Sequence, residues 1–467
     1  MIDQIIVLIY LLGTIILGFY VGKNTKTIKD FAVGPRNFST ILLVATVFAS
    51  IVDGSDTLGL VTEVFNGGPI FLISYMGIAC SHFLTAYYIA PKLAPYLGLI
   101  SSGDLLAKIY GPKAKTLMGV STLVESILLT GAQILAVSQL MKYFLDIPEA
   151  IAAISTAAII ILYSFRGGIK SVTATDLFQF GIMVIAIPMT CGLALKQIGG
   201  TEILFSFIKT NGLSMRPLSM GILSEHAAIF MSFALPCLYP LCIQRMLMCK
   251  NTQQIKKTFI ISGILMTPFH LTLGLMGIIA LIMMPNINHN FALPELINTV
   301  LPVGIKGFVV AGILAIIMST IDSVLNIGSI AITHDLIGSL RKKPLSDKAQ
   351  LFLVRISSII IAAGSIIIAL IFESALDVIF LMMVLGNSVF FPGYILGLTN
   401  LSTSKQGFWL GVLSGITTAL SCIFIFDIHL LHVMLIAIFA NILVHMSYVK
   451  VKEKGFTHQR LKAPSFM

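Results

Sequence analysis

Apolar residues in this chain form long uninterrupted runs, and these runs dominate the pattern. They lack the alternation of a half-buried strand and the i, i+3, i+4 spacing of an amphipathic helix. A helix of about 20 apolar residues crosses the roughly 30 Å hydrocarbon core of a bilayer. The pattern therefore predicts an all-α polytopic membrane protein with about thirteen spans, at residues 4–22, 40–64, 68–97, 113–144, 147–165, 172–195, 222–247, 257–284, 303–333, 349–371, 377–398, 406–426 and 428–449.

The composition agrees with a membrane protein. Of the 467 residues, 57% are hydrophobic and 11% are charged, against about 45–50% and about 25% in an average soluble protein. The six cysteines fall mostly inside apolar runs without metal-ligand spacing, which indicates small core residues. No nucleophile with a base and no metal motif gathers on one face of the membrane, so we expect neither enzyme activity nor a cofactor.

The basic residues predict an orientation. With the N-terminus outside, 25 of the 30 Lys and Arg residues fall on the cytoplasmic side and five on the other. This is the positive-inside bias, so we expect a multi-pass protein of the inner (plasma) membrane with a cytoplasmic C-terminus. The net charge of +10 then reflects loops that face anionic lipid rather than a nucleic-acid surface. The N-terminus lacks the basic region and cleavage site of a signal peptide, which indicates an uncleaved first helix.

Two of the predicted spans contain helix-breaking segments. The second span contains the polar stretch 49–57 with Asp53, Gly54 and Asp56, and the seventh contains Pro236 and Pro240. Breaks at corresponding positions of two five-helix halves are typical of inverted-repeat transporters with a site at the membrane midplane. The alternative is an ordinary proline kink, which only bends a membrane helix.

A pair of hydroxyls lies in the middle of the ninth span. Ser319 and Thr320, with the carbonyl of Ile316 one turn earlier, offer neutral oxygen ligands that suit sodium. The alternative is that both hydroxyls simply bond back to the carbonyl of the preceding turn.

Carboxylates inside a membrane are costly, so they are functional hypotheses by default. The acids in question are Asp53, Asp56, Glu125, Asp176 and Asp322. For Asp176 an interfacial helix start is the alternative, and for Glu125 a structural pair with a neighbouring helix. We expect the isolated histidines to make helix contacts rather than a proton relay; these are His82, His270 and His445.

Several segments resemble the signatures of one transporter family. Residues 166–179, with Gly167-Gly168 and Thr175-Asp176, are similar to the GG…AV…TD…Q signature of the sodium:solute symporters, which include proline, pantothenate, sialic acid and sugar symporters. Further similarities lie at residues 30–36 (F-x-x-G-R), 243–247 (QR-x-L), 319–323 and 333–335 (ST-x-DS…T-x-D). They occur in the family's order along the chain.

The resemblance implies a LeuT-type fold of two inverted five-helix repeats. The repeats would be residues 40–195 and 222–398, joined by an extracellular connection at 196–221. An extra helix and cytoplasmic loop (1–39) would precede them. Two C-terminal helices (399–449) and a cytoplasmic tail (450–467) would follow.

The resemblance also implies a sodium site between the first and eighth repeat helices. Its ligands would be the carbonyls of Ala49, Val52 and Ile316 and the hydroxyls of Ser319 and Thr320. Asp176 matches an acid on the family's sodium exit route. The chain departs from the pattern at Asp53, often serine in relatives, and at the bulky pair Ile317-Met318. The first departure favours an amine-bearing solute over a sugar.

We therefore expect a sodium-coupled symporter of a small organic solute that works by alternating access. A zwitterionic amino acid such as proline is the first hypothesis, because half-helix N-termini suit a carboxylate and Asp53 suits an amine. The expected substrate or gate residues are Ser50, Asp53, Asp56, Gln133 and Tyr239. Proton coupling through Asp53 and a transporter-like sensor remain alternatives. A monomer is compatible with the sequence, which leaves the oligomeric state open.

Overall fold

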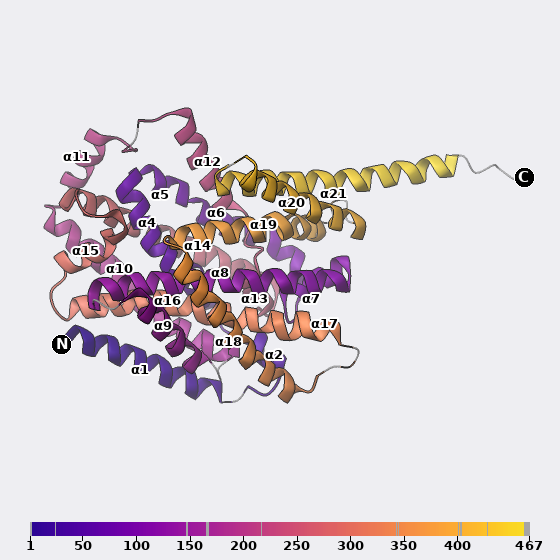
Figure 1. Cartoon of the computed structure of the whole chain (residues 1–467), viewed down its shortest axis with the longest axis horizontal. Coiled ribbons are helices and arrows are strands. Elements are labelled where there is room, and N and C mark those ends of the chain that lie inside the picture. Colours follow the sequence, from indigo (N-terminus) through magenta and orange to yellow (C-terminus); the bar gives the residue numbers. More distant parts are fainter. Residues whose placement is uncertain are drawn as a thin grey trace, which may run out of the picture.

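The computed structural model describes residues 2–23, 25–145, 148–164, 168–215, 217–341, 343, 345–399, 401, 404–426 and 428–461. Over these residues the protein is helical and contains no β-strand, as the sequence predicts (Figure 1). Arg166 and Gly167, which belong to the Gly-Gly signature, lie outside the described residues.

The first half of the chain contains eleven α-helices and two short helical segments of other types. They are α1 (Ile2–Gly22), α2 (Ile28–Ala32), α3 (Thr40–Ile51), α4 (Gly54–Gly67), α5 (Ile70–Tyr75), α6 (Gly77–Leu84), the π-helical η1 (Thr85–Ile89), the 3₁₀ segment η2 (Ala90–Tyr96), α7 (Ser102–Tyr110), α8 (Pro112–Leu145), α9 (Glu149–Ser164), α10 (Gly168–Gln197) and α11 (Thr201–Asn211).

The second half continues in the same way. It comprises α12 (Met220–Ala234), α13 (Pro240–Leu247), α14 (Thr252–Met283), η3 (His289–Phe291), α15 (Ala292–Val300), α16 (Ile305–Ile330), the π-helical η4 (Ala331–Ile337), α17 (Gly338–Leu340), α18 (Asp347–Ile371), α19 (Ala375–Thr399), α20 (Lys405–Phe424) and α21 (Leu430–Leu461).

Within the described residues, ten helices are long and apolar enough to cross a membrane, and the bent pair α3 and α4 forms an eleventh such unit. The two remaining predicted spans correspond to α9 and to the pair α12 and α13. Each of the thirteen apolar runs therefore contains a helix or a broken helix. Helix α21 continues past the predicted end of its span at residue 449.

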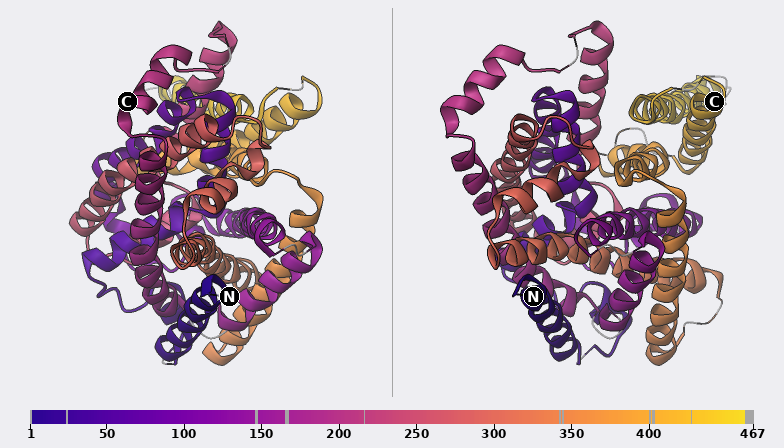
Figure 2. Two further views of the ribbon diagram at one scale, coloured as in Figure 1. Left: turned by 90° about the vertical axis from the view of Figure 1, so that its left-hand side faces the viewer. Right: turned by 60° about the vertical axis from the view of Figure 1, so that its left-hand side comes forward.

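Helix α16 forms the centre of the molecule. In its most apolar stretch 89% of the residues are buried inside the protein, against 22% for α1. It packs against α1, α3, α8 and α10. The helix α1 and the C-terminal helices α20 and α21 lie on opposite sides of the bundle (Figure 2). Polar residues on α16 therefore lie far from both water and lipid.

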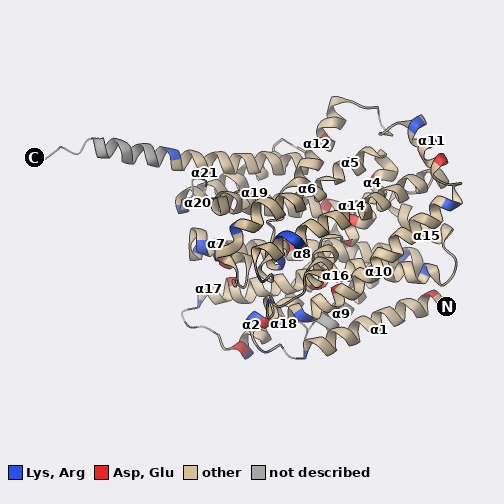
Figure 3. Cartoon of the chain, turned by 180° about the vertical axis from the view of Figure 1, so that it is seen from behind, with Lys and Arg blue, Asp and Glu red and all other residues tan. Residues whose placement is uncertain are grey.

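Charged side chains are concentrated toward the ends of the helices, and the middle of the molecule is mostly uncharged (Figure 3). The few charged groups among the helices include Asp53, Asp56, Glu125, Asp176 and Arg245, all buried. Asp322 and Asp335 are buried as well. Because an ionised group inside a bilayer is costly, these buried charged residues are the candidates for a functional site.

The first predicted break is present between α3 and α4, which meet at a bend of 57°. Val52 ends α3 in an extended conformation, and Asp53 caps α4, its carboxylate accepting a hydrogen bond from the amide of Asp56 at 2.7 Å. The side chain of Asp53 thus satisfies an amide that the interrupted helix leaves free.

The second predicted break separates α12 from α13 at residues 235–239. Pro236 cannot donate a backbone hydrogen bond, and Pro240 occupies the first turn of α13, where proline is tolerated. Neighbouring hydroxyls stabilise the open segment: Ser81 donates to the Leu235 carbonyl (2.5 Å), and Thr85 accepts from the Cys237 amide (2.7 Å).

Candidate functional site

The predicted sodium ligands lie where α3 ends beside the middle of α16. The Ser319 hydroxyl donates to the Ala49 carbonyl across the two helices at 2.6 Å and lies 2.8 Å from the Ile316 carbonyl. Thr320 donates to the same Ile316 carbonyl at 3.4 Å, so both hydroxyls also make the bond to the preceding turn. Val52 is fully buried at the end of α3. The donor set is neutral oxygen, which suits a hard cation.

A buried ion pair lies one turn further along α16. The Arg245 guanidinium of α13 is 3.7 Å from the Asp176 carboxylate of α10, and both side chains are almost completely buried. Arg245 also donates to the hydroxyls of Ser50 (2.9 Å) and Ser323 (2.5 Å), and Thr46 donates to Asp176. The pair joins α3, α10, α13 and α16. Asp176 is completely buried and lies inside α10, which begins at Gly168, so it is not at the start of a helix.

A second polar network connects the family-like loop at residues 30–36 to the core. Gln244 donates to the Asn326 side chain (2.7 Å) and to the Ala32 carbonyl (2.8 Å), while Asn326 donates to the Phe31 carbonyl (3.2 Å). Arg36 donates to the Cys249 carbonyl at 2.7 Å. Segments far apart in sequence therefore meet through amide side chains.

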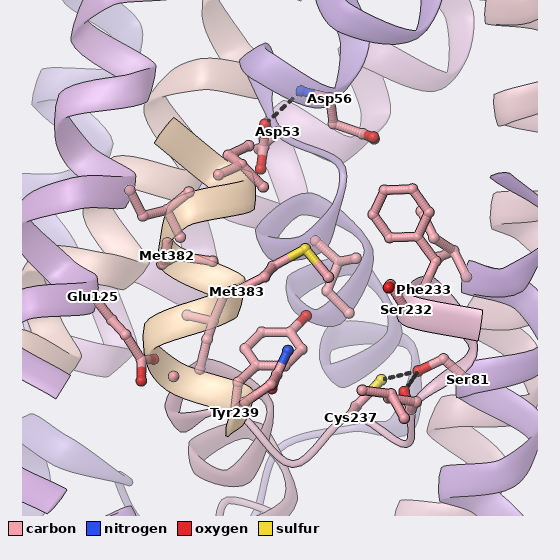
Figure 4. Close-up of a pocket in the computed structure, with 18 of the residues that line it drawn as sticks. Asp53, Asp56, Ser81, Glu125, Ser232, Phe233, Cys237, Tyr239, Met382 and Met383 are labelled. Atoms are coloured by element: carbon pink, nitrogen blue, oxygen red, sulfur yellow. Dashed lines mark hydrogen bonds between the residues drawn. The ribbon is translucent and has the colours of Figure 1, made fainter. Parts of the chain in front are cut away.

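A cavity of about 140 Å³ lies between the two helix breaks, with room for several water molecules. Its wall comes from α3, α4, α5, α6, α8, α12, α13, α19 and the open segment 235–239. Four of the predicted substrate or gate residues line it, namely Ser50, Asp53, Asp56 and Tyr239. Figure 4 shows the last three.

Gln133, the fifth predicted residue, lies behind the first break rather than among the residues that line the cavity. Its side chain accepts a hydrogen bond from the Gly54 amide (2.8 Å) and donates to the Ser55 hydroxyl (3.1 Å). It therefore satisfies backbone and side-chain groups at the start of α4, opposite the carboxylate cap of Asp53.

The histidines make different contacts. His270 lies 3.0 Å from the Asp56 carboxylate and 3.0 Å from the Met266 carbonyl, and His82 lies 2.8 Å from the Ile78 carbonyl. These are the helix contacts that we expected. His445 differs, since neither of its ring nitrogens has a hydrogen-bond partner among the described residues.

Glu125 lines the cavity from α8 and accepts a hydrogen bond from Ser121 of its own helix at 3.0 Å. No ion pair joins it to a neighbouring helix within the described part of the chain. The structural pair that we considered for Glu125 is thus not formed there.

A further cluster lies near the ends of α7 and η4. Lys115 is 2.7 Å from Asp104, His334 is 3.0 Å from Asp104, and Ser101 donates to Asp335 at 2.6 Å. Burial disfavours the charged form of Asp104, but the hydrogen bond and charge of His334, together with Lys115, hold the pKa of this carboxyl well below its ordinary value. Lys115 already supplies a cation to the carboxylates, so a metal ion is not required here.

The sequence pattern did not identify several of the residues that make the hydrogen bonds around this site. Arg245 was noted only as part of a family-like motif, and Ser81, Thr85 and Asn326 were not singled out. Arg245 and Asn326 are recognisable in the sequence as polar residues inside apolar runs, but their hydrogen-bond partners come from distant parts of the chain. Ser81 and Thr85 could not be distinguished in the sequence, because serine and threonine are common in membrane helices.

Comparison with known proteins gives a consistent set of similarities. Residues 31–415 match the profile of the sodium:solute symporter family. The chain is 25% identical to the osmoregulated proline transporter OpuE of Bacillus subtilis (strain 168) over 434 residues, covering 88% of this chain and 87% of OpuE. It is 24% identical to a sodium/proline symporter of Staphylococcus aureus (strain JH9) over 387 residues, covering 78% and 74%.

Solved structures share the fold. A substrate-bound, outward-open Na⁺-coupled sialic acid symporter superimposes with a TM-score of 0.84 at 17% identity, over 97% of this chain and 98% of that one. The nucleobase-cation-symport-1 transporter Mhp1 gives a TM-score of 0.60 at 13% identity, over 92% and 96%. Both are LeuT-fold symporters, so the fold expected from the sequence is confirmed.

Proposed function

Because this chain belongs to the sodium:solute symporter family, a family of multi-pass membrane transporters, we propose that it couples sodium entry to the uptake of a small amine-bearing solute. A zwitterionic amino acid such as proline is the first candidate. Two similar relatives are named as proline transporters.

The observation that supports sodium coupling most directly is the contact between Ser319 and the Ala49 carbonyl. It places the end of the broken helix α3 within hydrogen-bond distance of the hydroxyl pair on α16. In the proposal, sodium binds among the carbonyls of Ala49, Val52 and Ile316 and the hydroxyls of Ser319 and Thr320. The ion then substitutes for the hydrogen bond between the two helices.

The solute would bind in the cavity between the breaks. Asp53 and Leu241 at the start of α13 line this region, so an ammonium group can pair with Asp53 while a carboxylate accepts from the amides at the N-terminus of α13. Tyr239 would close the cavity as an aromatic gate, and Gln133 would hold the first break in shape. Asp176 would lie on the route by which sodium leaves.

Transport would follow from rocking of one set of helices against the other. In this proposal residues 40–195 and 222–398 are the two inverted repeats, the N-terminus lies outside, and the protein acts as a monomer in the inner membrane. One positive charge moving inward across 100 mV gains about 2.3 kcal/mol. That energy sustains roughly fifty-fold accumulation of the solute.

One observation favours proton coupling as a second candidate. His270 and Asp56 form a pair at 3.0 Å, and Asp56 lines the cavity, so an imidazole and a carboxylate, two groups able to carry a proton, meet at the edge of the cavity. In that case an acidic outer solution would drive uptake without sodium.

The experiment is uptake of labelled proline into proteoliposomes under a sodium gradient or a potassium gradient at the same membrane voltage. We expect sodium to be required, and Ser319→Ala and Thr320→Ala to raise the sodium concentration for half-maximal uptake at least tenfold. Thr417→Ala is the matched control, because Thr417 is exposed on α20 and bonds only to its own helix. Equal sodium dependence in Thr320→Ala and the unaltered protein would contradict the proposed site.

A further inference from the structure

Three carboxylates line the cavity, and their surroundings are unequal. Asp53 accepts the Asp56 amide at the N-terminus of α4, where the helix dipole favours a negative charge. Asp56 lies 3.0 Å from His270. Glu125 accepts a hydrogen bond from the Ser121 hydroxyl at 3.0 Å and from no other described residue. Only Glu125 therefore has neither a cationic partner nor a helix end to offset its charge.

The residues that line the cavity do not supply a cation to pair with Glu125. No Lys or Arg occurs among the described residues that line it, and the one histidine among them, His82, bonds to the carbonyl of Ile78 on its own helix. Arg245 is engaged with Asp176, Ser50 and Ser323. A carboxylate buried among membrane helices is costly unless a proton or a cation neutralises it. The missing cation can come from a bound molecule.

A glycine of α19 lies beside the Glu125 carboxylate. Gly386 of α19 lines the cavity next to it, and a Cβ atom at that position would lie 2.7 Å from the nearer oxygen of Glu125. Figure 4 shows the Glu125 side chain against α19, with Met382 and Met383 nearby on the same helix. Any larger residue at position 386 would push the carboxylate away from its present place.

The opposite wall also points to a ligand. The Ser232 hydroxyl on α12 is buried, has no hydrogen-bond partner among the described residues and points into the cavity (Figure 4). Phe233, Tyr239 and Met383 line the space between the two walls. Aromatic faces and thioethers attract an organic ammonium group, whereas a hard metal ion prefers oxygen ligands. The occupant beside Glu125 is thus better matched by an organic cation than by a second sodium ion.

The geometry points to Glu125 as a subsite for a second cationic group on the solute, which makes a basic amino acid such as lysine the preferred substrate. This inference rests on the proposed symport function and narrows its substrate class. The α-ammonium group binds at Asp53, the side-chain ammonium group binds at Glu125, and the methylene chain passes the aromatic and sulfur-containing wall. Proline has a single cationic nitrogen and cannot pair with Asp53 and Glu125 at once.

The test compares two ligands of similar shape, lysine and norleucine, which differ in the terminal ammonium group. Sodium-driven uptake of each is measured in proteoliposomes, and binding of each is measured by thermal shift in sodium and in potassium. We expect lysine to bind at least tenfold more tightly than norleucine. Glu125→Gln should lower this preference about tenfold to a hundredfold, because a hydrogen bond to a charged group is lost. Glu125→Asp should keep part of the preference.

Controls separate this inference from the proposed function. Glu373→Gln removes an exposed acid outside the cavity and should leave the lysine preference unchanged. If Glu125→Gln does not fold, Gly386→Ala provides a second test, since its methyl group displaces the carboxylate. Sodium-dependent uptake with equal affinity for lysine and norleucine, or a lysine preference that both cavity variants retain, overturns the inference alone. Absence of sodium-dependent uptake and binding for every solute overturns the proposed function instead.

Discussion

The two helix breaks that enclose the cavity are stabilised in different ways. Between α3 and α4 the open backbone is short, and the chain caps it locally through Asp53, with Gln133 of α8 as one outside partner. Between α12 and α13 five residues are non-helical, and hydroxyls of α6 and η1 supply the hydrogen bonds. The first break depends mainly on its own sequence, and the second depends on its neighbours.

The way in which each break is stabilised explains which groups its residues contact. A locally capped break can present bare carbonyls, such as that of Ala49, to the hydroxyls of α16. A break stabilised from outside leaves its own side chains, including Tyr239, free to line a cavity. Substitutions can therefore disturb one break without the other. Four of them, in order of decreasing effect, test the comparison.

The largest effect is expected at Gly54, the first residue of α4. A Cβ atom there would overlap Ile317 of α16 and lie 2.9 Å from the Gln133 side chain. Gly54→Ala should lower the free energy of unfolding by about 3 kcal/mol, the upper range for overpacking a buried site. Thermal unfolding in detergent measures the loss. Gly192→Ala is the control, because a Cβ atom there meets no other atom within 4 Å. Equal stability of the two variants would contradict the packing at the first break.

At the second break, Thr85→Val removes the acceptor of the Cys237 amide while keeping the shape of the side chain. A buried amide without a partner costs about 2 kcal/mol, so stability should fall by that amount. Thr272→Val is a suitable reference, since Thr272 is half-buried and bonds only to a carbonyl of its own helix. A Thr85 variant as stable as the reference would show that the open segment does not need α6 and η1.

A smaller effect is expected from Asp53→Ala, which removes the cap of α4 and should cost about 1 kcal/mol of stability. Asp53→Asn keeps a capping oxygen but not the charge. The asparagine variant should therefore retain stability and lose affinity for amine-bearing solutes, as measured by thermal shift with and without the solute. If both variants lose stability equally, the carboxylate acts through its charge and not as a cap.

The smallest effect is expected from Pro240→Ala in the first turn of α13. Proline is tolerated there, and its replacement increases the entropy of the unfolded chain, so a loss of about 0.5 kcal/mol is expected. Urea unfolding monitored by circular dichroism is sensitive enough to detect it. A loss above 2 kcal/mol would indicate that Pro240, rather than Ser81 and Thr85, holds the second break open.

The sequence predicted the elements well because the bilayer imposes a length on every span. Proline, glycine and aspartate within apolar runs also located both breaks. The meeting of Ser319 with Ala49 was implied by the family resemblance. The hydroxyl spacing alone pointed to Ser319, Thr320 and the Ile316 carbonyl, which lie on one helix.

Other parts of the site depend on tertiary packing and could not be read from one sequence. Gln133 was expected in the substrate cavity, but it bonds to the start of α4, and nothing in its own helix reveals which face meets the break. The partner of Arg245 lies on α10, some seventy residues earlier in the chain. The isolation of Glu125 became visible only once the cavity wall and its lack of lysine and arginine were known.

Ser50 contacts both the buried ion pair and the cavity. Its hydroxyl accepts from Arg245, which is paired with Asp176, and its residue also lines the cavity between the breaks. A solute that changes the hydrogen bonding of the Ser50 hydroxyl changes the electrostatic surroundings of Asp176. An ion near Asp176 in turn changes the electrostatic surroundings of the bound solute. Thermodynamic linkage requires the two effects to be equal, so in the proposed symport the factor by which sodium changes solute affinity equals the factor by which the solute changes sodium affinity.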